Sequence, residues 1–342
     1  MKFFCLCMSP AIDATVTLPC APKGDGEIFK DVAEEENVGG KTVNVARWLA
    51  LRGADVACGG LLGEDNDRPF AKELAKYGIV DRFVRVAGAT RRNEMIVWPG
   101  GSMKLNRAAF PGLGNGTTGT TGTDGTTGTT ETTGTIDALI DKVLSRMSGS
   151  SQMSRDSGVA ILSGSLPPAV PKDFYARAVA AFKSQGWLTV LDASGEAMRL
   201  GLEAGPDFIK PNAEECEPLV GFVPKTPEEF ARATAMLREK AAHVIISDGG
   251  AGAWFDGEFI PAPKVEVVDT TAAGDTLLAE FCWRMLGDLG NGEPPPPRLW
   301  RSSRGMGNAG RWAVAAGSAA CTMPGGAPPA RELVERLCHD VP

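Results

Sequence analysis

Short apolar runs alternate with longer amphipathic segments along most of this chain, and this alternation is its strongest constraint on the fold. The runs Phe3–Met8, Gly158–Ser163 and His243–Ser247 have the length and composition of buried strands. The segments Val43–Leu51 and Lys172–Gln185 carry apolar residues at helical spacing. The same patterns predict strands at Ala54–Gly60, Leu188–Asp192 and Phe208–Lys210, and helices at Arg68–Lys76, Pro227–Lys240, Thr276–Leu286 and Met306–Ala320. This order predicts an α/β fold of three αβα layers, with a Rossmann-like, mostly parallel sheet between the helices.

Two stretches lack the helix that should follow a strand in this pattern. Residues from about 14–38 and 83–107 have the pattern of short strands broken by turns, and we expect them to form a small β-sheet lid. Residues 112–135 are almost entirely Gly and Thr, which cannot bury a core, so we expect a flexible insertion there. With these additions, we expect residues 1–342 to form a single domain.

Charge and composition exclude several classes of function. The net charge of −7 and the pI near 5.1 argue against nucleic acid or an anionic membrane as the main partner. No stretch approaches the roughly 18 to 20 apolar residues that span a bilayer, and the apolar run after Lys2 is too short for a signal peptide. We therefore expect a cytoplasmic protein. With only two histidines and scattered cysteines, a zinc site is not expected.

The segment Asp269–Asp275 combines small residues with an aspartate just before an apolar helix. Small residues let backbone N–H groups converge at a helix N-terminus, where anions bind. An aspartate in this place is also a common helix cap. The small residues that lead up to Asp275 favour a catalytic function, because a plain cap does not need them.

The segment Asn37–Asn44 ends in a Gly-Lys-Thr sequence that resembles a P-loop. The leading glycine of a P-loop would fall at Glu35, within three glutamates that would repel phosphates, so we reject that interpretation. What remains is either an ordinary turn and cap, or a Gly-Gly turn that directs Lys41 and Asn44 toward a polar ligand.

Three further turns follow predicted strands. They are Leu162–Pro168, Ile209–Asn212 with Glu215, and Ile246–Gly252. Open α/β sheets bind ligands at the carboxyl ends of their strands. Each turn alone is a weak signal, but together with Asp269–Asp275 they predict one site along one edge of the sheet.

These segments together resemble the ribokinase-like family of sugar kinases, also called the phosphofructokinase B family, over nearly the whole chain. Met8–Asp13 is similar to the family's opening Asn-Pro-Ala-x-Asp, and Lys210–Glu215 to its Asn-x-x-Glu element. Gly39–Ala46 and Asp269–Asp275 match its two signatures. The segments most similar to the branch that acts on phosphorylated hexoses are Thr90–Asn93, Ser163–Pro168 and Leu191–Glu196. That branch includes 1-phosphofructokinase and tagatose-6-phosphate kinase.

The resemblance implies a role for each matching residue. Asp275 would be the general base, and the N–H groups of Ala272, Ala273 and Gly274 would form an anion hole for the transferred phosphoryl group. The residues implied in substrate binding are Asp13, Gly39, Gly40, Lys41, Asn44, Arg91, Asn93 and Ser163, with Arg91 on the phosphate already present on the sugar. Those implied in nucleotide binding are Asn212, Ser247, Gly249, Gly250, Gly252 and Gly317. Glu215 would organise Mg²⁺ through water, with ATP as co-substrate and a monovalent cation as a further ion.

Three residues depart from the family pattern. Thr42 stands where the family usually has glycine, Ala272 where glycine is commoner, and Ser9 where asparagine is usual. We therefore keep two alternatives to a kinase for fructose 1-phosphate or tagatose 6-phosphate. One is a kinase for an unphosphorylated sugar or a nucleoside, and the other is a catalytically silent sugar or nucleotide sensor. The resemblance also implies a homodimer formed through the lid, where exposed strand edges would be covered.

Overall fold

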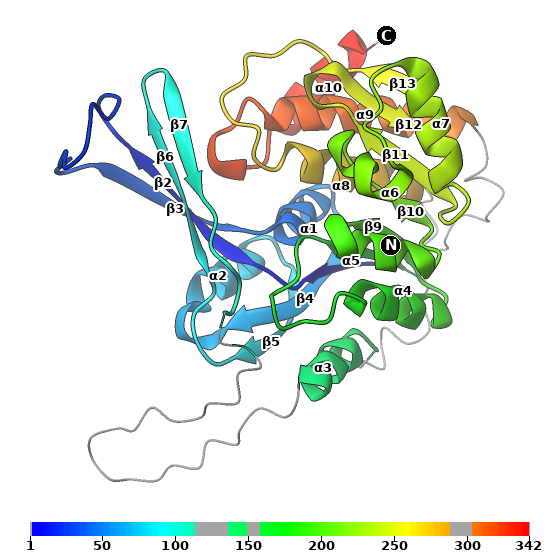
Figure 1. The fold of residues 1–342 in the computed structure, drawn as a ribbon, viewed down its shortest axis with the longest axis horizontal. Helices are drawn as coiled ribbons and strands as arrows, with labels where there is room; N and C mark the ends of the chain where they lie inside the picture. The colour runs from blue at the N-terminus through cyan, green and yellow to red at the C-terminus, as the bar shows by residue number, and fades with distance from the viewer. Residues whose placement is uncertain (1, 112, 114–135, 149–157, 288–302, 342) are drawn as a thin grey trace.

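A computed structural model describes residues 2–111, 113, 136–148, 158–287 and 303–341 (Figure 1). The Gly/Thr-rich insertion expected at 112–135 lies, except for Leu113, outside the described residues. Within the described part of the chain, no helix is both long enough and apolar enough to cross a membrane.

The main sheet has nine strands in the order β13-β12-β11-β10-β9-β8-β1-β4-β5. All neighbours pair in parallel except at β12 and β13, which form an antiparallel hairpin at one edge. The strands are β1 (Lys2–Cys7), β4 (Asp55–Gly63), β5 (Val80–Val86), β8 (Val159–Ser163), β9 (Leu188–Asp192), β10 (Phe208–Ile209), β11 (His243–Ser247), β12 (Gly252–Phe255) and β13 (Glu258–Pro261).

Helices cover both faces of this sheet and confirm the three-layer α/β fold (Figure 1). One face packs against α1 (Lys41–Leu51), α2 (Arg68–Lys76), α8 (Ala273–Gly287), α9 (Ser303–Ala320) and α10 (Arg331–Asp340). The other packs against α3 (Ile136–Ser148), α4 (Phe174–Ser184), α5 (Gly195–Glu203), α6 (Glu217–Val220) and α7 (Pro227–Leu237). Successive side chains of β1 alternate between the two cores, with Phe3 and Cys5 in one and Phe4 and Leu6 in the other. This two-sided burial explains why the strands are apolar throughout.

A second, four-stranded sheet projects from the main body in the order β3-β2-β6-β7 (Figure 1). Its strands are β2 (Ala11–Thr17), β3 (Ala33–Gly39), β6 (Arg92–Trp98) and β7 (Gly101–Leu105). The small sheet is confirmed, but residues 83–86 do not belong to it, contrary to our expectation. They lie in β5 and pair with β4 at the edge of the main sheet, because Phe83, Val84 and Val86 are buried in the two cores.

Chain direction places the small sheet over one edge of the main sheet. The parallel strands β1, β8, β9, β10 and β11 all end at this edge. The small sheet begins directly after β1, and its strand β3 leads through Gly40 into α1. The fold therefore gathers the predicted strand-end segments beneath one small sheet.

A buried carboxylate joins the helices α1 and α8. Glu280 on α8 has no exposed surface, and its Oε2 accepts a hydrogen bond of 2.9 Å from the Trp48 indole on α1. The same oxygen lies 3.2 Å from Nε of Arg52, and Oε1 accepts a 2.9 Å hydrogen bond from Arg284. Because two arginines and an indole converge on one carboxylate, Glu280 fixes the relative position of these helices.

We expect Glu280→Gln to lower the free energy of unfolding by about 3 kcal/mol, because the buried Arg52 guanidinium loses its counter-charge. Urea denaturation measures the change. A matched control is Glu203→Gln, which removes an exposed carboxylate paired with Lys240 and should change the unfolding free energy by less than about 0.5 kcal/mol. Equal losses in the two variants would contradict the role given to Glu280.

Candidate active site

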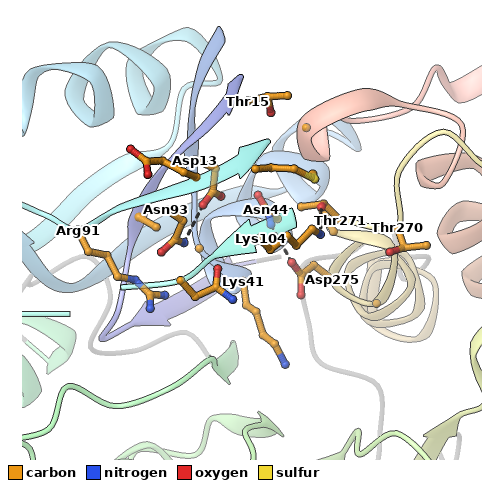
Figure 2. A pocket seen from close by; sticks show the side chains of 18 of the residues that line it. Asp13, Thr15, Lys41, Asn44, Arg91, Asn93, Lys104, Thr270, Thr271 and Asp275 are labelled. Atoms are coloured by element: carbon orange, nitrogen blue, oxygen red, sulfur yellow. Dashed lines mark hydrogen bonds between the residues drawn. The ribbon is translucent and has the colours of Figure 1, made fainter. Parts of the chain in front are cut away.

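A cavity of about 430 Å³ lies between the small sheet and the carboxyl edge of the main sheet (Figure 2). This volume is in the range of small-molecule binding sites. The predicted site residues that line it are Asp13, Gly40, Lys41, Asn44, Arg91, Asn93, Asn212, Glu215, Ser247, Ala272, Gly274 and Asp275. The structure therefore brings together residues from both sheets and from the N-termini of α1 and α8.

Two residues predicted to bind substrate lie behind the cavity wall. A Cβ on Gly39 would come within 1.8 Å of Oδ2 of Asp13, so the glycine leaves room for that carboxylate. Ser163 is buried, and its hydroxyl donates a 3.0 Å hydrogen bond to Asp192. Thr42, which stands where the family usually has glycine, also has its side chain directed away from the cavity. Its buried hydroxyl lies 2.9 Å from the carbonyl oxygens of Ser163 and of Leu6 near the end of β1.

The glycines predicted to bind nucleotide have different positions. A Cβ on Gly252 would come within 2.1 Å of the Ile260 carbonyl oxygen, so this glycine allows the β12–β13 hairpin to close. A Cβ on Gly317 would lie 3.2 Å from the first carbonyl oxygen of α8, so it allows close packing of α8 and α9. Gly249 and Gly250 are exposed beyond the end of β11, with open space around them. Of these four glycines, only Gly249 and Gly250 are accessible to a ligand.

Asp275 is the third residue of α8, and its side chain is buried at the base of the cavity. Its Oδ2 accepts a 2.8 Å hydrogen bond from Nδ2 of Asn44 on α1 (Figure 2). Burial, reinforced by the negative charge of Asp192, raises the pKa of Asp275 to about 6. The hydrogen bond from Asn44 and the charges of Lys41 and Lys210 oppose this rise. The result is a carboxylate that is ionised at neutral pH but more basic than usual.

The turn before α8 presents backbone N–H groups to the cavity. The N–H of Ala273 donates to the Thr270 carbonyl at 3.3 Å, and that of Thr276 donates to the Ala272 carbonyl at 2.8 Å. The N–H groups of Ala272 and Gly274 have no acceptor among the described residues, so two of the three expected anion-hole donors are free. Ala272 has a φ of 63°, a left-handed conformation that favours glycine and costs about 1 kcal/mol for alanine.

Asp269 holds this turn in place. Its Oδ1 accepts hydrogen bonds from the N–H and the hydroxyl of Thr271, at 2.9 and 2.8 Å. Its Oδ2 accepts one from the N–H of Gly325, at 3.1 Å. Lys104 of the small sheet lies 3.1 Å from the Thr271 hydroxyl and 3.9 Å from Asp269, and so joins the small sheet to the turn. Lys104 was not predicted as a site residue, because its contact with Thr271 joins residues that are 167 positions apart.

Two lysines share a buried carboxylate beneath the cavity. Asp192 at the end of β9 has no exposed surface and lies 3.2 Å from Lys210 and 3.5 Å from Lys41. Burial alone would raise the pKa of Asp192, but the two lysines and the Ser163 hydroxyl lower it below its ordinary value. Burial would likewise lower the pKa of Lys41, but the attraction of Asp192 and other carboxylates raises it, so Lys41 is charged. Sequence reasoning missed Asp192 and Lys210 as site residues, although both lie at predicted strand ends.

The small sheet contributes the opposite wall of the cavity. Asp13 on β2 accepts a 2.8 Å hydrogen bond from Asn93 on β6 (Figure 2). The Arg91 guanidinium donates to the carbonyl oxygens of Ser9, Pro10 and Arg107, at 3.1, 3.3 and 2.9 Å. Among the described residues it pairs with no carboxylate. Its positive charge is therefore positioned but not neutralised, as an anion-binding residue requires.

Asn212 and Glu215 form a closed pair beyond the end of β10. The N–H of Glu215 donates to Oδ1 of Asn212 at 2.7 Å, and the N–H of Asn212 donates to Oε2 of Glu215 at 3.0 Å. The described residues contain no cluster of three side chains that could hold a metal. A single carboxylate with one oxygen free suits Mg²⁺ that is bound mainly by water and phosphates.

The chain is similar in sequence to known proteins over most of its length. The family model "pfkB family carbohydrate kinase" matches residues 9–100 and 138–332. A 1-phosphofructokinase of Vibrio cholerae is 31% identical over 287 residues, which are 82% of each chain. A 1-phosphofructokinase of Rhodobacter capsulatus is 30% identical over 319 residues, which are 85% of this chain and 92% of the relative.

Solved structures show the same fold at lower identity. Phosphofructokinase-2 from Escherichia coli superimposes with a TM-score of 0.77 at 22% identity, covering 100% of this chain and 99% of the other. Ribokinase from Arabidopsis thaliana superimposes with a TM-score of 0.67 at 19% identity, covering 98% of both chains. The ribokinase-like architecture inferred from sequence is therefore confirmed.

The raised pKa of Asp275 makes stability depend on pH. An acid with a pKa of about 6 in the folded protein, and near its ordinary 3.8 when unfolded, binds the proton more tightly when folded. The unfolding free energy therefore falls as pH rises through this window. We expect Asp275→Asn to remove this fall and to be about 3 kcal/mol more stable than the parent at pH 8, with little difference at pH 3.

Urea denaturation across this pH range measures the effect, and Asp173→Asn, an exposed aspartate before α4, is the control. A gain that is the same at both ends of the pH range would show that Asp275 does not titrate as described.

Proposed function

The chain belongs to the pfkB family of carbohydrate kinases, and we propose that it transfers the terminal phosphoryl group of ATP to a hydroxyl of a hexose phosphate. The acceptor we propose is fructose 1-phosphate, ahead of tagatose 6-phosphate, because the curated relatives with about 30% identity are named 1-phosphofructokinase. ATP is the co-substrate of this family, whereas the acceptor depends on residues of the cavity.

One observation carries this proposal, namely that Asp275 and Arg91 line the same cavity. Asp275 is a buried carboxylate of raised pKa, which suits a general base. Arg91 is an arginine without a carboxylate partner in the described part of the chain, which suits a phosphate that is already on the sugar. An acceptor that is both a phosphate and an alcohol satisfies the two groups at once.

The charges around Asp275 suit this transfer. Its carboxylate would accept the proton of the attacking hydroxyl as that oxygen bonds to the terminal phosphorus of ATP and the bond from this phosphorus to ADP breaks, releasing ADP. Phosphoryl transfer depends on positioning and on neutralising the charge of the transferred group. The free N–H groups of Ala272 and Gly274 and the charged Lys41 would supply that neutralisation. Asp13 and Asn93, which hydrogen-bond to each other, would orient the sugar hydroxyls.

The nucleotide would lie along the ends of β10 and β11. Ser247 and Asn212 line the cavity there, and the exposed Gly249 and Gly250 leave room for the nucleotide. Mg²⁺ would neutralise the ATP phosphates, with Glu215 holding its waters. A monovalent cation, implied by resemblance alone, stays an expectation.

We also propose that the small sheet acts as a lid. Lys104 on β7 already contacts the turn before α8, so this sheet reaches across the cavity. Met103 and Leu105, on either side of Lys104 in β7, point to the other face of the small sheet, because successive side chains of a strand alternate between its faces. There they are 46% and 41% exposed. A second copy of the chain could cover this face, which supports the homodimer expected from the sequence.

Substrate preference tests the proposed acceptor. We expect fructose 1-phosphate to have a kcat/KM at least about 100-fold above that of fructose, because the Arg91–phosphate contact is charge-assisted. Arg91→Met should raise KM for fructose 1-phosphate about 10- to 100-fold and leave KM for ATP unchanged. ADP release measures both, with Arg199→Met, an exposed arginine on α5, as control. Similar rates for free and phosphorylated sugars would support the alternative of a kinase for unphosphorylated substrates.

Removing the base tests the mechanism. We expect Asp275→Asn to lower kcat about 100- to 10,000-fold without a comparable change in KM, because an amide cannot accept the proton. In the parent protein, kcat/KM should fall below a pH of about 6, as Asp275 becomes protonated. A folded Asp275→Asn variant with near-normal turnover would contradict the assignment, and no ADP release by the parent with any sugar would support a silent sensor.

A further inference from the structure

Arg47 on α1 is a buried arginine behind the wall of the cavity. It is 4% exposed, and its Nη1 donates a 3.1 Å hydrogen bond to Glu73 on α2. Its Nη2 donates to Oδ1 of Asn44 and lies 3.5 Å from the Gly326 carbonyl oxygen. It therefore contacts Asn44 from the side opposite to Asp275.

This contact determines how the Asn44 amide is oriented. A guanidinium has only donors, so the amide atom that faces Arg47 must be the oxygen. The NH₂ group of Asn44 must then face Asp275, where Nδ2 lies 2.8 Å from Oδ2. The positions of the oxygen and the nitrogen in the Asn44 amide are therefore set by the donors of Arg47, although these two atoms are otherwise hard to tell apart.

The orientation matters because it decides which form of Asp275 is stabilised. An NH₂ group donates to the ionised carboxylate and favours it, whereas an amide oxygen would favour the protonated acid. The ionised form is the one that can accept a proton from an alcohol. Without Arg47, the Asn44 amide could turn by 180° and present its oxygen to a protonated Asp275.

We propose that Arg47 is a positioning residue, anchored by Glu73, that orients Asn44 so that its amide keeps Asp275 ready to act as a base. The proposal rests on the proposed role of Asp275 and adds a requirement for a residue that touches neither substrate nor nucleotide. Arg47, Asn44 and Asp275 are linked in this order by two hydrogen bonds.

Other charged groups also act on Asp275, and none of them replaces this hydrogen bond. Asp192 at the end of β9 disfavours the ionised form, while Lys41 on α1 and Lys210 after β10 favour it. Both lysines are bound to Asp192, at 3.5 and 3.2 Å. Among the described residues, Asn44 is the one whose side chain donates a hydrogen bond to Asp275.

The first test reads the titration of Asp275 without any substrate. The unfolding free energy is measured from pH 4 to 8 for the parent and for Arg47→Met, each with and without Asp275→Asn. The pH-dependent difference within each pair gives the pKa of Asp275. We expect this pKa to rise by about one unit in Arg47→Met, a tenfold change in the protonation equilibrium, and to return toward its parent value in Arg47→Lys. An unchanged pKa in Arg47→Met overturns the proposal.

Glu73→Gln is a milder variant, because the Glu73 side chain is 20% exposed and its loss leaves Arg47 in place. It should shift the pKa in the same direction by less. Arg52→Met is the matched control, since it removes another buried arginine, directly after the end of α1, that pairs with Glu280 instead of Asn44. It should lower stability without moving the titration, and a shift equal to that of Arg47→Met would count against the proposal.

The second test uses turnover of fructose 1-phosphate with ATP. If the pKa rises from about 6 to about 7, kcat/KM of Arg47→Met should fall about fivefold more at pH 6 than at pH 8. A loss of the same size at both values would mean that Arg47 only supports the fold. If the unfolding data show the shift while the parent releases no ADP, the positioning stands and the proposed function fails.

Discussion

The burial of one carboxylate at the start of α8 is the constraint on which the site depends. Taking Asp275 out of water makes it basic enough to accept a proton, and the same burial destabilises the ionised form. Its neighbours must therefore stabilise that charge without removing its basicity. A neutral amide from Asn44 does this, because it donates one hydrogen bond without adding a positive charge in contact. Farther along α8, the buried Glu280 joins the same two helices through its contacts with Trp48 and Arg52.

Much of this arrangement could be predicted from the sequence, because it depends on chain direction and local pattern. Apolar runs alternating with helices required a parallel sheet, and parallel strands place their carboxyl ends together. The segment that ends in Asp275 was therefore expected at this edge, and the family resemblance implied that Arg91 and Lys41 would lie at the same site. All three line the cavity. The small sheet was expected because two stretches of short strands lack a following helix, although residues 83–86 were wrongly assigned to it and belong to the strand Val80–Val86 of the main sheet. Strand pattern alone does not say which sheet a strand joins.

The contacts that were not predicted join segments that are far apart in the sequence. Lys41 and Asp192 are 151 residues apart, and Asn44 and Asp275 are 231 apart, so no local pattern indicates that they meet. Arg47 lies on the predicted helix Val43–Leu51, and nothing in the spacing of that helix indicates its contacts with Asn44 and Glu73. Ser163 was expected in contact with substrate, but its hydroxyl has a nearer partner in Asp192. The sequence identified strand ends well, whereas burial decided which of their side chains reach the cavity.

Asp192 explains how two lysines can lie near a base without suppressing it. Lys41 and Lys210 would lower the pKa of Asp275 strongly if either paired with it directly, and a carboxylate of ordinary acidity is a weaker base. Both lysines instead pair with Asp192, whose own charge acts in the opposite direction on Asp275. The charge of Asp192 thus acts on Asp275 in the opposite direction to the charges of the two lysines, while the lysines remain at the cavity wall, where a phosphoryl group would meet them. A buried acid behind the cavity wall would therefore allow the proposed cationic stabilisation and general-base catalysis in one cavity.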